Sequence, residues 1–220
     1  MLELLNPQED DCVLDVGCGL GAQLIPVAER VDRIVGLDVS ADMMLELRKR
    51  LTRANVSLLV GDMDDLSDLQ IGGPFTLAYS VYSLYYSRDP ASVVETVARL
   101  LRGAGARFVT VNPGVGNNAE WFEDLGHICE LPAAVRGVPD FGDRVLAPAF
   151  GNTFRTVTRH SYRDRVRFPT VDAVMTYYDA CAPYCPLDTR DEARRYFAAK
   201  LDREGDYQIT KCSLGLVGTL

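Results

Sequence analysis

A glycine-rich run near the start of the chain gives the sequence its strongest chemical signal. The letters VLDVGCGLG, at 13–21, pass directly from apolar residues into a group of glycines. Glycines at such a place let the backbone turn sharply and let a ligand approach the main chain without a Cβ in the way. The run predicts a strand, a ligand-binding turn and then a helix, although a tight turn with no ligand would show the same pattern.

Acidic residues at the ends of two further predicted strands extend this signal. Asp38 follows the glycine turn by about 20 residues, the position from which a carboxylate accepts hydrogens from both hydroxyls of a ribose. Asp62 and Met63 end the next strand at the same carboxyl edge of the sheet, where Asp62 can accept from an adenine amino group. Met43 and Met63 would form apolar walls for the ring. A turn role for Asp62 and a core role for Met43 stay open as alternatives.

The elements that must position these residues follow from the hydropathy pattern. The first half alternates short β-branched runs with longer amphipathic segments, which predicts a parallel sheet covered by helices. One helix, at 41–53, should face the core with Met43, Met44, Leu47 and Leu51. Strands are expected at 12–16, 33–37, 56–60, 75–79 and 106–111, and the other helices at 22–30 and from Asp89-Pro90 to about 101.

The second half is less regular. From 112 to 152 the pattern dissolves into Gly, Pro and isolated aromatic residues, so we expect a substrate-side insertion or lid within a single domain spanning 1–220. A long strand at 153–168 follows, then helices at 170–180 and 189–203 and a closing strand at 207–217.

Composition narrows the choice of partners. The net charge of −8 argues against nucleic acid, because proteins that neutralise phosphates usually carry a basic surface. The arginines between Arg155 and Arg167 alternate with apolar residues, as on a solvated strand face. No apolar run approaches the length of a membrane span, and 1–11 does not have the pattern of a leader peptide, so we expect a cytoplasmic protein with no membrane partner. The sequence does not indicate an oligomeric state.

Six cysteines are scattered without a paired C-x-x-C arrangement and should be reduced thiols. Cys181 and Cys185 could share a helical face with His160 nearby, but we expect no metal site.

Taken together, these motifs resemble the class I S-adenosylmethionine-dependent methyltransferases. The resemblance rests on DVGCGLG at 15–21, GLDVS at 36–40, GD at 61–62, and the segment 75–90 with its ending YYSRDP. It implies an α/β, Rossmann-like, doubly wound, seven-stranded sheet that is mostly parallel and has an antiparallel C-terminal strand. It also implies an enzyme that moves the methyl group of S-adenosylmethionine to a small-molecule acceptor by in-line displacement, leaving S-adenosylhomocysteine.

The resemblance further implies which residues bind the cofactor. Asp15, Gly17 and Gly19, with Cys18 between the glycines, would shape the pocket for the methionine part. Asp38 would bind the ribose.

The other end of the cofactor would be bound by residues from later elements. Val39 and Met43 would flank the adenine, and Asp62 and Met63 would cap its edge. Ser80 would close the site beside the sulfonium.

A general base is needed only if the nucleophile arrives protonated. Tyr85, Tyr86, His127 and His160 are weak candidates for that role, and the sequence does not choose among them. Core packing explains many of the aromatic residues, but some could instead line an apolar pocket over the cofactor: Tyr82, Tyr85, Tyr86, Trp121, Phe122, Tyr177 and Tyr178.

Two other function classes stay open on the sequence. Gly17, Gly19 and Ala22 also satisfy G-x-G-x-x-A, so an NAD(P)-dependent oxidoreductase is one alternative. Asp15 argues against it, because dinucleotide folds usually have an apolar residue there. The other alternative is a non-catalytic nucleoside-binding module that keeps the pocket without turnover.

Overall fold

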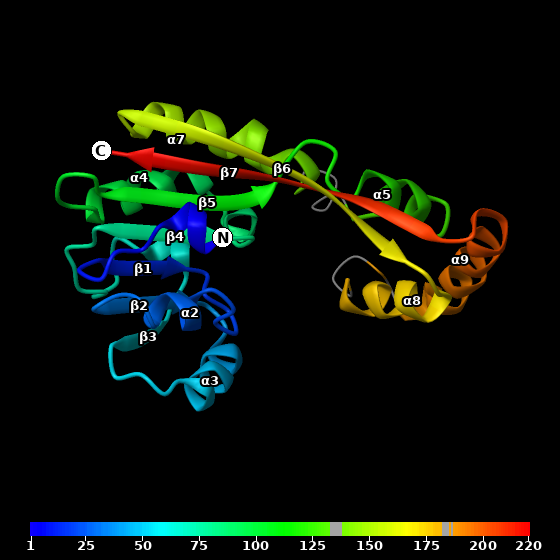
Figure 1. The fold of residues 1–220 in the computed structure, drawn as a ribbon, viewed down its shortest axis with the longest axis horizontal. Helices are drawn as coiled ribbons and strands as arrows, with labels where there is room; N and C mark the ends of the chain where they lie inside the picture. The colour runs from blue at the N-terminus through cyan, green and yellow to red at the C-terminus, as the bar shows by residue number, and fades with distance from the viewer. Residues whose placement is uncertain (133–137, 182–184, 186) are drawn as a thin grey trace. The chain divides into compact units, whose positions relative to one another are not determined.

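A computed structural model describes residues 1–132, 138–181, 185 and 187–220. The chain forms two compact units (Figure 1). The first unit comprises Met1–Asn112, Gly142–His160 and Leu214–Leu220, and the second comprises Pro113–Phe141 and Ser161–Ser213. The segment expected as one insertion at 112–152 is therefore divided between the units. The single domain expected from the sequence stays a prediction.

A seven-stranded sheet organises the chain in the order β3-β2-β1-β4-β5-β7-β6. Its first five strands are parallel where they pair, as in the register from Cys12↔Arg33 to Val16↔Leu37 between β1 and β2. Strand β7 runs antiparallel to β5, confirming the predicted fold class. The strands are β1 Cys12–Val16, β2 Arg33–Asp38, β3 Val56–Val60, β4 Leu77–Val81, β5 Arg107–Pro113, β6 Thr156–Phe168 and β7 Tyr207–Thr219.

Some helices begin at a short polar side chain that caps them. Ser40 Oγ accepts from the Met43 amide at 3.3 Å, and Asp89 Oδ1 accepts from the Ser92 amide at 3.1 Å, which satisfies amides that a helix leaves unpaired. The helices are α1 Leu2–Leu5, α2 Leu24–Ala28, α3 Ala41–Arg50, α4 Pro90–Leu100, α5 Ala119–Gly126, α7 Ala147–Thr153, α8 Val171–Ala180 and α9 Arg190–Glu204. Single helical turns are η1 Met63–Asp65, η2 Leu84–Tyr86, η3 Val138–Asp140, η4 Gly142–Leu146 and η5 Leu187–Thr189.

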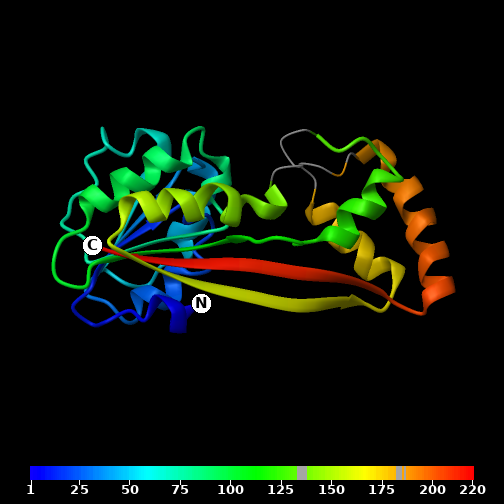
Figure 2. The same cartoon turned by 90° about the horizontal axis from the view of Figure 1, so that it is seen from above.

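The first unit buries its core on both faces of the sheet. Helices α1, α2 and α3 lie on one face, and α4 and α7 lie on the other (Figure 2). Leu24 of α2 and Leu47 of α3 are fully buried in a cluster with Val13 of β1. On the other face, Phe108 of β5 stacks on Phe150 of α7 with ring centroids 5.3 Å apart.

The second unit has a separate aromatic core. Trp121, the single tryptophan of the chain, is fully buried and stacks on Phe197 with ring centroids 5.3 Å apart. Tyr178 is also fully buried there. Trp121 and Tyr178 are therefore core residues, and of the two roles open to them core packing is confirmed.

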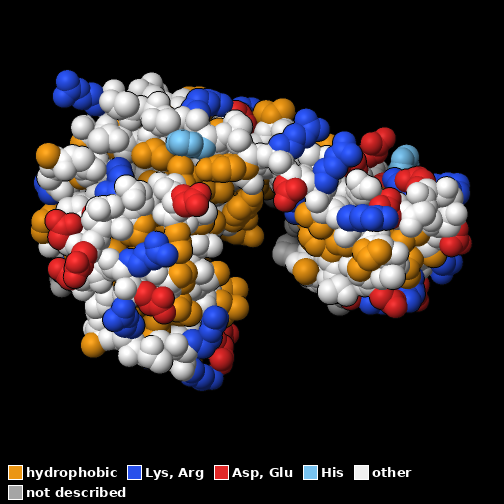
Figure 3. Space-filling model, viewed as in Figure 1, with side chains coloured by type: hydrophobic (Ala, Val, Ile, Leu, Met, Phe, Trp, Pro, Cys, Tyr) orange, Lys and Arg blue, Asp and Glu red, His pale blue; other side chains and the backbone are white. Residues whose placement is uncertain are grey.

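Charged side chains of both signs are interspersed on the visible face of each unit (Figure 3). The figure shows no continuous basic area on that face. Among the described residues, no helix combines the length and the apolar content that crossing a bilayer requires.

Several element boundaries differ from the prediction. Strand β4 begins at Leu77 rather than at 75, because Phe75 forms only an isolated bridge with Leu101. Helix α3 ends at Arg50, since Leu51 is already extended. Met43 is 45% exposed, so the predicted core stripe holds for Met44 and Leu47 but not for Met43.

Candidate functional site

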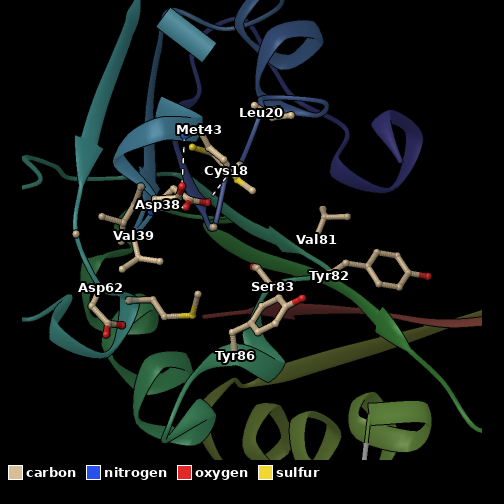
Figure 4. A pocket seen from close by; sticks show the side chains of 16 residues that line it. Cys18, Leu20, Asp38, Val39, Met43, Asp62, Val81, Tyr82, Ser83 and Tyr86 are labelled. Carbon is tan, nitrogen blue, oxygen red and sulfur yellow. Dashed lines mark hydrogen bonds between the residues drawn. The ribbon is translucent and has the colours of Figure 1, made fainter. Parts of the chain in front are cut away.

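A cavity of about 620 Å³ opens in the first unit at the carboxyl ends of the parallel strands (Figure 4). Its walls come from the β1–α2 turn, the end of β2, the start of α3, the loop after β3 and the loop after β4. The strand order reverses between β1 and β4, the kind of position at which open α/β sheets bind ligands. The cavity is lined by Gly17, Cys18, Gly19, Leu20, Leu37, Asp38, Val39, Ser40, Met43, Gly61, Asp62, Met63, Val81, Tyr82, Ser83 and Tyr86.

The glycine turn is tied to β2 through its own amides. The Gly17 and Cys18 amides donate to the Leu37 carbonyl at 2.8 and 3.0 Å, and the Gly19 amide donates to Asp38 Oδ2 at 2.8 Å. Both glycines have positive φ, +79° and +52°. A Cβ on Gly19 would meet only the Met43 sulfur, at 4.0 Å. The backbone of Gly19 therefore faces open space, while the three amides are already used within the protein.

Asp38 is held by two backbone donors at the cavity wall. Oδ2 accepts from Gly19, and Oδ1 accepts from the Ser40 amide at 2.9 Å. Each carboxylate oxygen can accept a second hydrogen bond. Because Asp38 lines the cavity, both oxygens keep acceptor capacity for a ligand that carries a pair of hydroxyls.

Two predicted site residues, Asp15 and Ser80, lie behind the wall rather than on it. Asp15 is 3% exposed, and burial raises its pKa to about 8; the Tyr79 hydroxyl opposes this shift and the Asp38 charge adds to it. Ser80 is fully buried, and its hydroxyl pairs with the Ser83 hydroxyl at 2.5 Å. Neither residue lines the cavity, and their assignment as cofactor-binding residues stays a prediction.

Apolar side chains line the cavity beside Asp38 (Figure 4). Val39 is 68% exposed and Met43 45% exposed, and both line the cavity with Met63 (Figure 4). Asp62 Oδ1 accepts from the Asp64 amide at 2.9 Å, so the turn role considered for Asp62 is confirmed. Asp62 also lines the cavity. Its other carboxylate oxygen, Oδ2, takes no part in the bond to the Asp64 amide.

Sequence reasoning missed Ser83, which completes the wall beside the glycine turn. Its hydroxyl donates to the Val16 carbonyl at 2.8 Å, and a Cβ on Gly17 would lie 2.4 Å from Ser83 Cβ. Nothing local in the sequence marks this contact, because it joins positions 67 residues apart. Leu20, Ser40 and Val81 were also not predicted to line the cavity.

Among the weak base candidates, Tyr86 is the one in the cavity wall, where it is 73% exposed. Tyr85 lies beside it, with ring centroids 4.5 Å apart, and burial raises the pKa of its hydroxyl well above the usual value. His160 packs near Gly215 in the first unit, and His127 lies near Tyr196 in the second; neither lines the cavity.

All six cysteines are free thiols. Over the described part of the chain, no group of three or more His, Cys, Asp or Glu side chains is placed to hold a metal ion. Cys181 and Cys185 belong to the second unit, whereas His160 belongs to the first.

The donor set fits an adenosyl sulfonium. Asp38 has carboxylate oxygens that could accept from a pair of hydroxyls, and Val39 and Met43 have exposed apolar surface on which a ring could pack. The backbone of Gly19 leaves room that any side chain would occupy.

The strand order, the glycine turn and the acid after β2 define the Rossmann-like class to which S-adenosylmethionine-dependent methyltransferases belong. Residues 13–105 match the family described as a methyltransferase domain. The resemblance to class I S-adenosylmethionine-dependent methyltransferases is therefore confirmed in sequence and fold.

Individual relatives match part of the chain. An aklanonic acid methyltransferase of Streptomyces sp. (strain C5) is 32% identical over 114 residues, which are 48% of this chain and 50% of the relative. A nocamycin O-methyltransferase of Saccharothrix syringae is 31% identical over 109 residues, 48% of this chain and 39% of the relative. The chain thus spans half of these curated relatives or less.

Solved structures match more of its length. The YcgJ protein of Bacillus subtilis has a TM-score of 0.68 at 14% identity, covering 100% of this chain and 95% of that one. This likeness shows a shared fold.

Proposed function

We propose that this protein transfers the methyl group of S-adenosylmethionine to a small-molecule acceptor by in-line displacement. The proposal is carried by Asp38, a carboxylate in the cavity wall whose backbone partners leave acceptor capacity for two ribose hydroxyls. The cofactor supplies a methyl group on an electrophilic sulfonium. The protein's residues then have to bind, orient the reactants and exclude water.

Charge at the site favours a cationic ligand. Asp38 lines the cavity and Asp15 lies just behind the wall, with its pKa raised by burial. A positive group near them would be attracted to Asp38 and would favour the ionised form of Asp15. Val39 and Met43 would hold the adenine, and Asp62 and Met63 would lie along its edge.

The backbone amides of the glycine turn already donate hydrogen bonds within the protein, which argues against the NAD(P)-dependent alternative. Dinucleotide folds bind a pyrophosphate at the glycine turn, where free backbone N–H groups meet the negative charge. Here the amides of Gly17, Cys18 and Gly19 donate to the Leu37 carbonyl and to Asp38. A pyrophosphate at this turn would therefore find these donors occupied and would lie close to the Asp38 carboxylate.

A small molecule is the better acceptor class for this surface. A net charge of −8 disfavours binding a polyanion such as nucleic acid. The names of two curated relatives, an aklanonic acid methyltransferase and a nocamycin O-methyltransferase, support the same choice.

Calorimetry tests the cofactor. S-adenosylhomocysteine should bind the purified protein and NADH should not. Asp38→Ala should weaken S-adenosylhomocysteine at least about tenfold, since it removes a charged acceptor. Asp42→Ala, which removes an exposed carboxylate in the first turn of α3, is the matched control and should leave affinity within about twofold. Absence of affinity in protein shown to be folded by circular dichroism would overturn the proposal.

Turnover separates an enzyme from a binding module. Protein incubated with methyl-labelled S-adenosylmethionine and fractionated low-mass metabolites should transfer label into one fraction and release S-adenosylhomocysteine. Tight binding of S-adenosylhomocysteine with no transfer to any fraction would favour the non-catalytic module.

A further inference from the structure

The lysines of this chain differ in how their charge is balanced. The chain has three, at positions 49, 200 and 211. Lys49 pairs with Glu46 at 2.5 Å, and Lys200 pairs with both oxygens of Asp124 at 2.6 and 2.8 Å. Lys211, in β7 within the second unit, has no carboxylate oxygen within 4.0 Å among the residues that the structure describes.

Lys211 is nevertheless held in a defined place. Its Nζ donates to Tyr177 Oη at 2.6 Å and lies 4.8 Å from the centre of the Tyr177 ring. Asn118 Nδ2 donates to the same hydroxyl oxygen at 3.2 Å. Burial lowers the pKa of Lys211, while the neighbouring Cys181 shifts it the other way. The ammonium is partly desolvated and keeps N–H donors beyond the one given to Tyr177.

Asn118 adds an independent observation. The residue is 5% exposed, and its Oδ1 is buried with no hydrogen-bond partner among the described residues. Its backbone has a left-handed φ of +55°, and its amide donates to the Thr210 carbonyl at 2.8 Å. Buried amide oxygens are rarely left without a donor, so this orphaned acceptor points to a missing polar partner.

The missing counter-charge is not explained by a shortage of acids. Asp and Glu number 31 against 23 Lys and Arg. Glu120, which contacts the residue next to Lys211, accepts hydrogen bonds from the Thr210 amide and hydroxyl at 2.9 and 2.6 Å, one on each carboxylate oxygen. A half-buried ammonium without a counter-ion costs free energy, and a bound anion would offset that cost.

We propose that Lys211, positioned by Tyr177 and Asn118, binds the anionic oxygen of an organic ligand, either a carboxylate or an ionised phenol. The anion site lies within the second unit and does not rest on the proposed function.

The three lysines make the test direct. Protein labelled with 13C at lysine Cε gives one resonance per lysine, each assigned by a Lys→Arg variant. Sodium benzoate is the probe, benzamide is its neutral analogue, and sodium chloride controls for ionic strength. The Lys211 resonance should shift saturably with benzoate, while Lys49 and Lys200 follow the salt control. Equal responses of Lys211 to benzoate, benzamide and chloride would overturn the proposal.

Variants then test the positioning. Tyr177→Phe keeps the Lys211 resonance and should lower the affinity for benzoate at least about threefold, because the ammonium loses its fixed partner. Lys211→Met should abolish benzoate binding seen by saturation transfer to the ligand, whereas Lys49→Met should not change it. If Lys211→Met does not fold, the Tyr177→Phe titration decides, and unchanged affinity there would contradict the proposal.

Calorimetry with S-adenosylhomocysteine keeps the two proposals apart. Lys211→Met should bind it as the parent does. Benzoate binding at Lys211 in a protein with no affinity for S-adenosylhomocysteine would retain the anion site and reject the cofactor. The reverse result would reject the anion site alone.

Discussion

Asp15 is a carboxyl group buried beneath a proposed cofactor site, and its protonation should affect stability. Burial raises its pKa from 3.8 to about 8 in the folded protein. The folded state therefore holds a proton that the unfolded chain has lost, so the stability linked to Asp15 is complete below about pH 4 and is lost as the pH rises to about 8. We expect the free energy of unfolding to fall less between pH 5 and 8.5 for Asp15→Asn than for the parent protein.

Urea denaturation at several pH values measures this difference. Asp42→Asn removes an exposed carboxylate in the same unit and should keep the parent's slope. Parallel pH profiles for Asp15→Asn and the parent would contradict the assignment.

Gly17 should tolerate a methyl group less than Gly105 does. Both have a φ of +79°, but a Cβ on Gly17 would lie 2.4 Å from Ser83 Cβ, whereas one on Gly105 would meet nothing within 4 Å. Gly105→Ala should cost about 1–2 kcal/mol for the left-handed backbone. Gly17→Ala should cost a further 1–3 kcal/mol or so from overpacking, measured by urea denaturation. Equal losses would show that the Ser83 contact is unimportant.

Residue-level prediction worked where local sequence order fixes position. Asp38 could be predicted because the carboxyl end of β2 must lie beside the turn that follows β1. Ser83 could not, because its role depends on the close approach of the loop after β4 to Gly17. Asp15 and Ser80 were placed near the right wall, but the sequence did not show that they lie behind it.

At the scale of elements, one carboxylate links two walls of the cavity. Asp64 in η1 accepts from the Ser87 hydroxyl at 2.5 Å and from the Arg88 amide and Nε, each at 2.9 Å. These bonds join the turn that carries Met63 to the loop that carries Tyr86. We expect Asp64→Ala to lower the affinity for S-adenosylhomocysteine severalfold in calorimetry, although Asp64 does not line the cavity.

Asp65→Ala is the control for this link. Asp65 is the next residue, its side chain is 61% exposed, and it lies 3.7 Å from the Arg88 guanidinium. Exposed pairs of this kind contribute little, so its removal should hardly change affinity. Similar losses in both variants would mean that general charge, rather than the link through Asp64, is responsible.

Element boundaries were predictable where a short strand is followed directly by a glycine. The bounds of β1 and β3 agree with the sequence, since Gly17 and Gly61 follow their last residues. Helices α5 and α7 were missed in the segment 112–152. Helix α7 has seven residues and includes Pro148 and Gly151, which break the periodicity used to recognise a helix.

At the scale of the whole molecule, the single buried tryptophan gives the second unit its own probe. Trp121 reports on the second unit, and the proposed cofactor site lies in the first. Because β6 and β7 have residues in both units, we expect one cooperative transition. S-adenosylhomocysteine at 100 times its Kd should then stabilise the protein by about 2.7 kcal/mol, seen equally by Trp fluorescence and far-UV circular dichroism.

Asp38→Ala, which should bind at least about tenfold more weakly, should be stabilised by about 1.4 kcal/mol or less at the same ligand concentration. A ligand-induced shift in circular dichroism with no change in the Trp121 midpoint would show instead that the units unfold separately.

The bonds made by Asp38 have a consequence for judging relatives of this protein. The carboxylate fixes the Gly19 amide and the Ser40 amide whether or not any ligand is present. A descendant that had abandoned adenosyl ligands would still need this aspartate to keep its loop in shape. Val39, 68% exposed, gains nothing comparable from the protein itself. An apolar side chain retained at the position of Val39 in a homologue should therefore be the more informative sign that the homologue still binds adenosyl ligands.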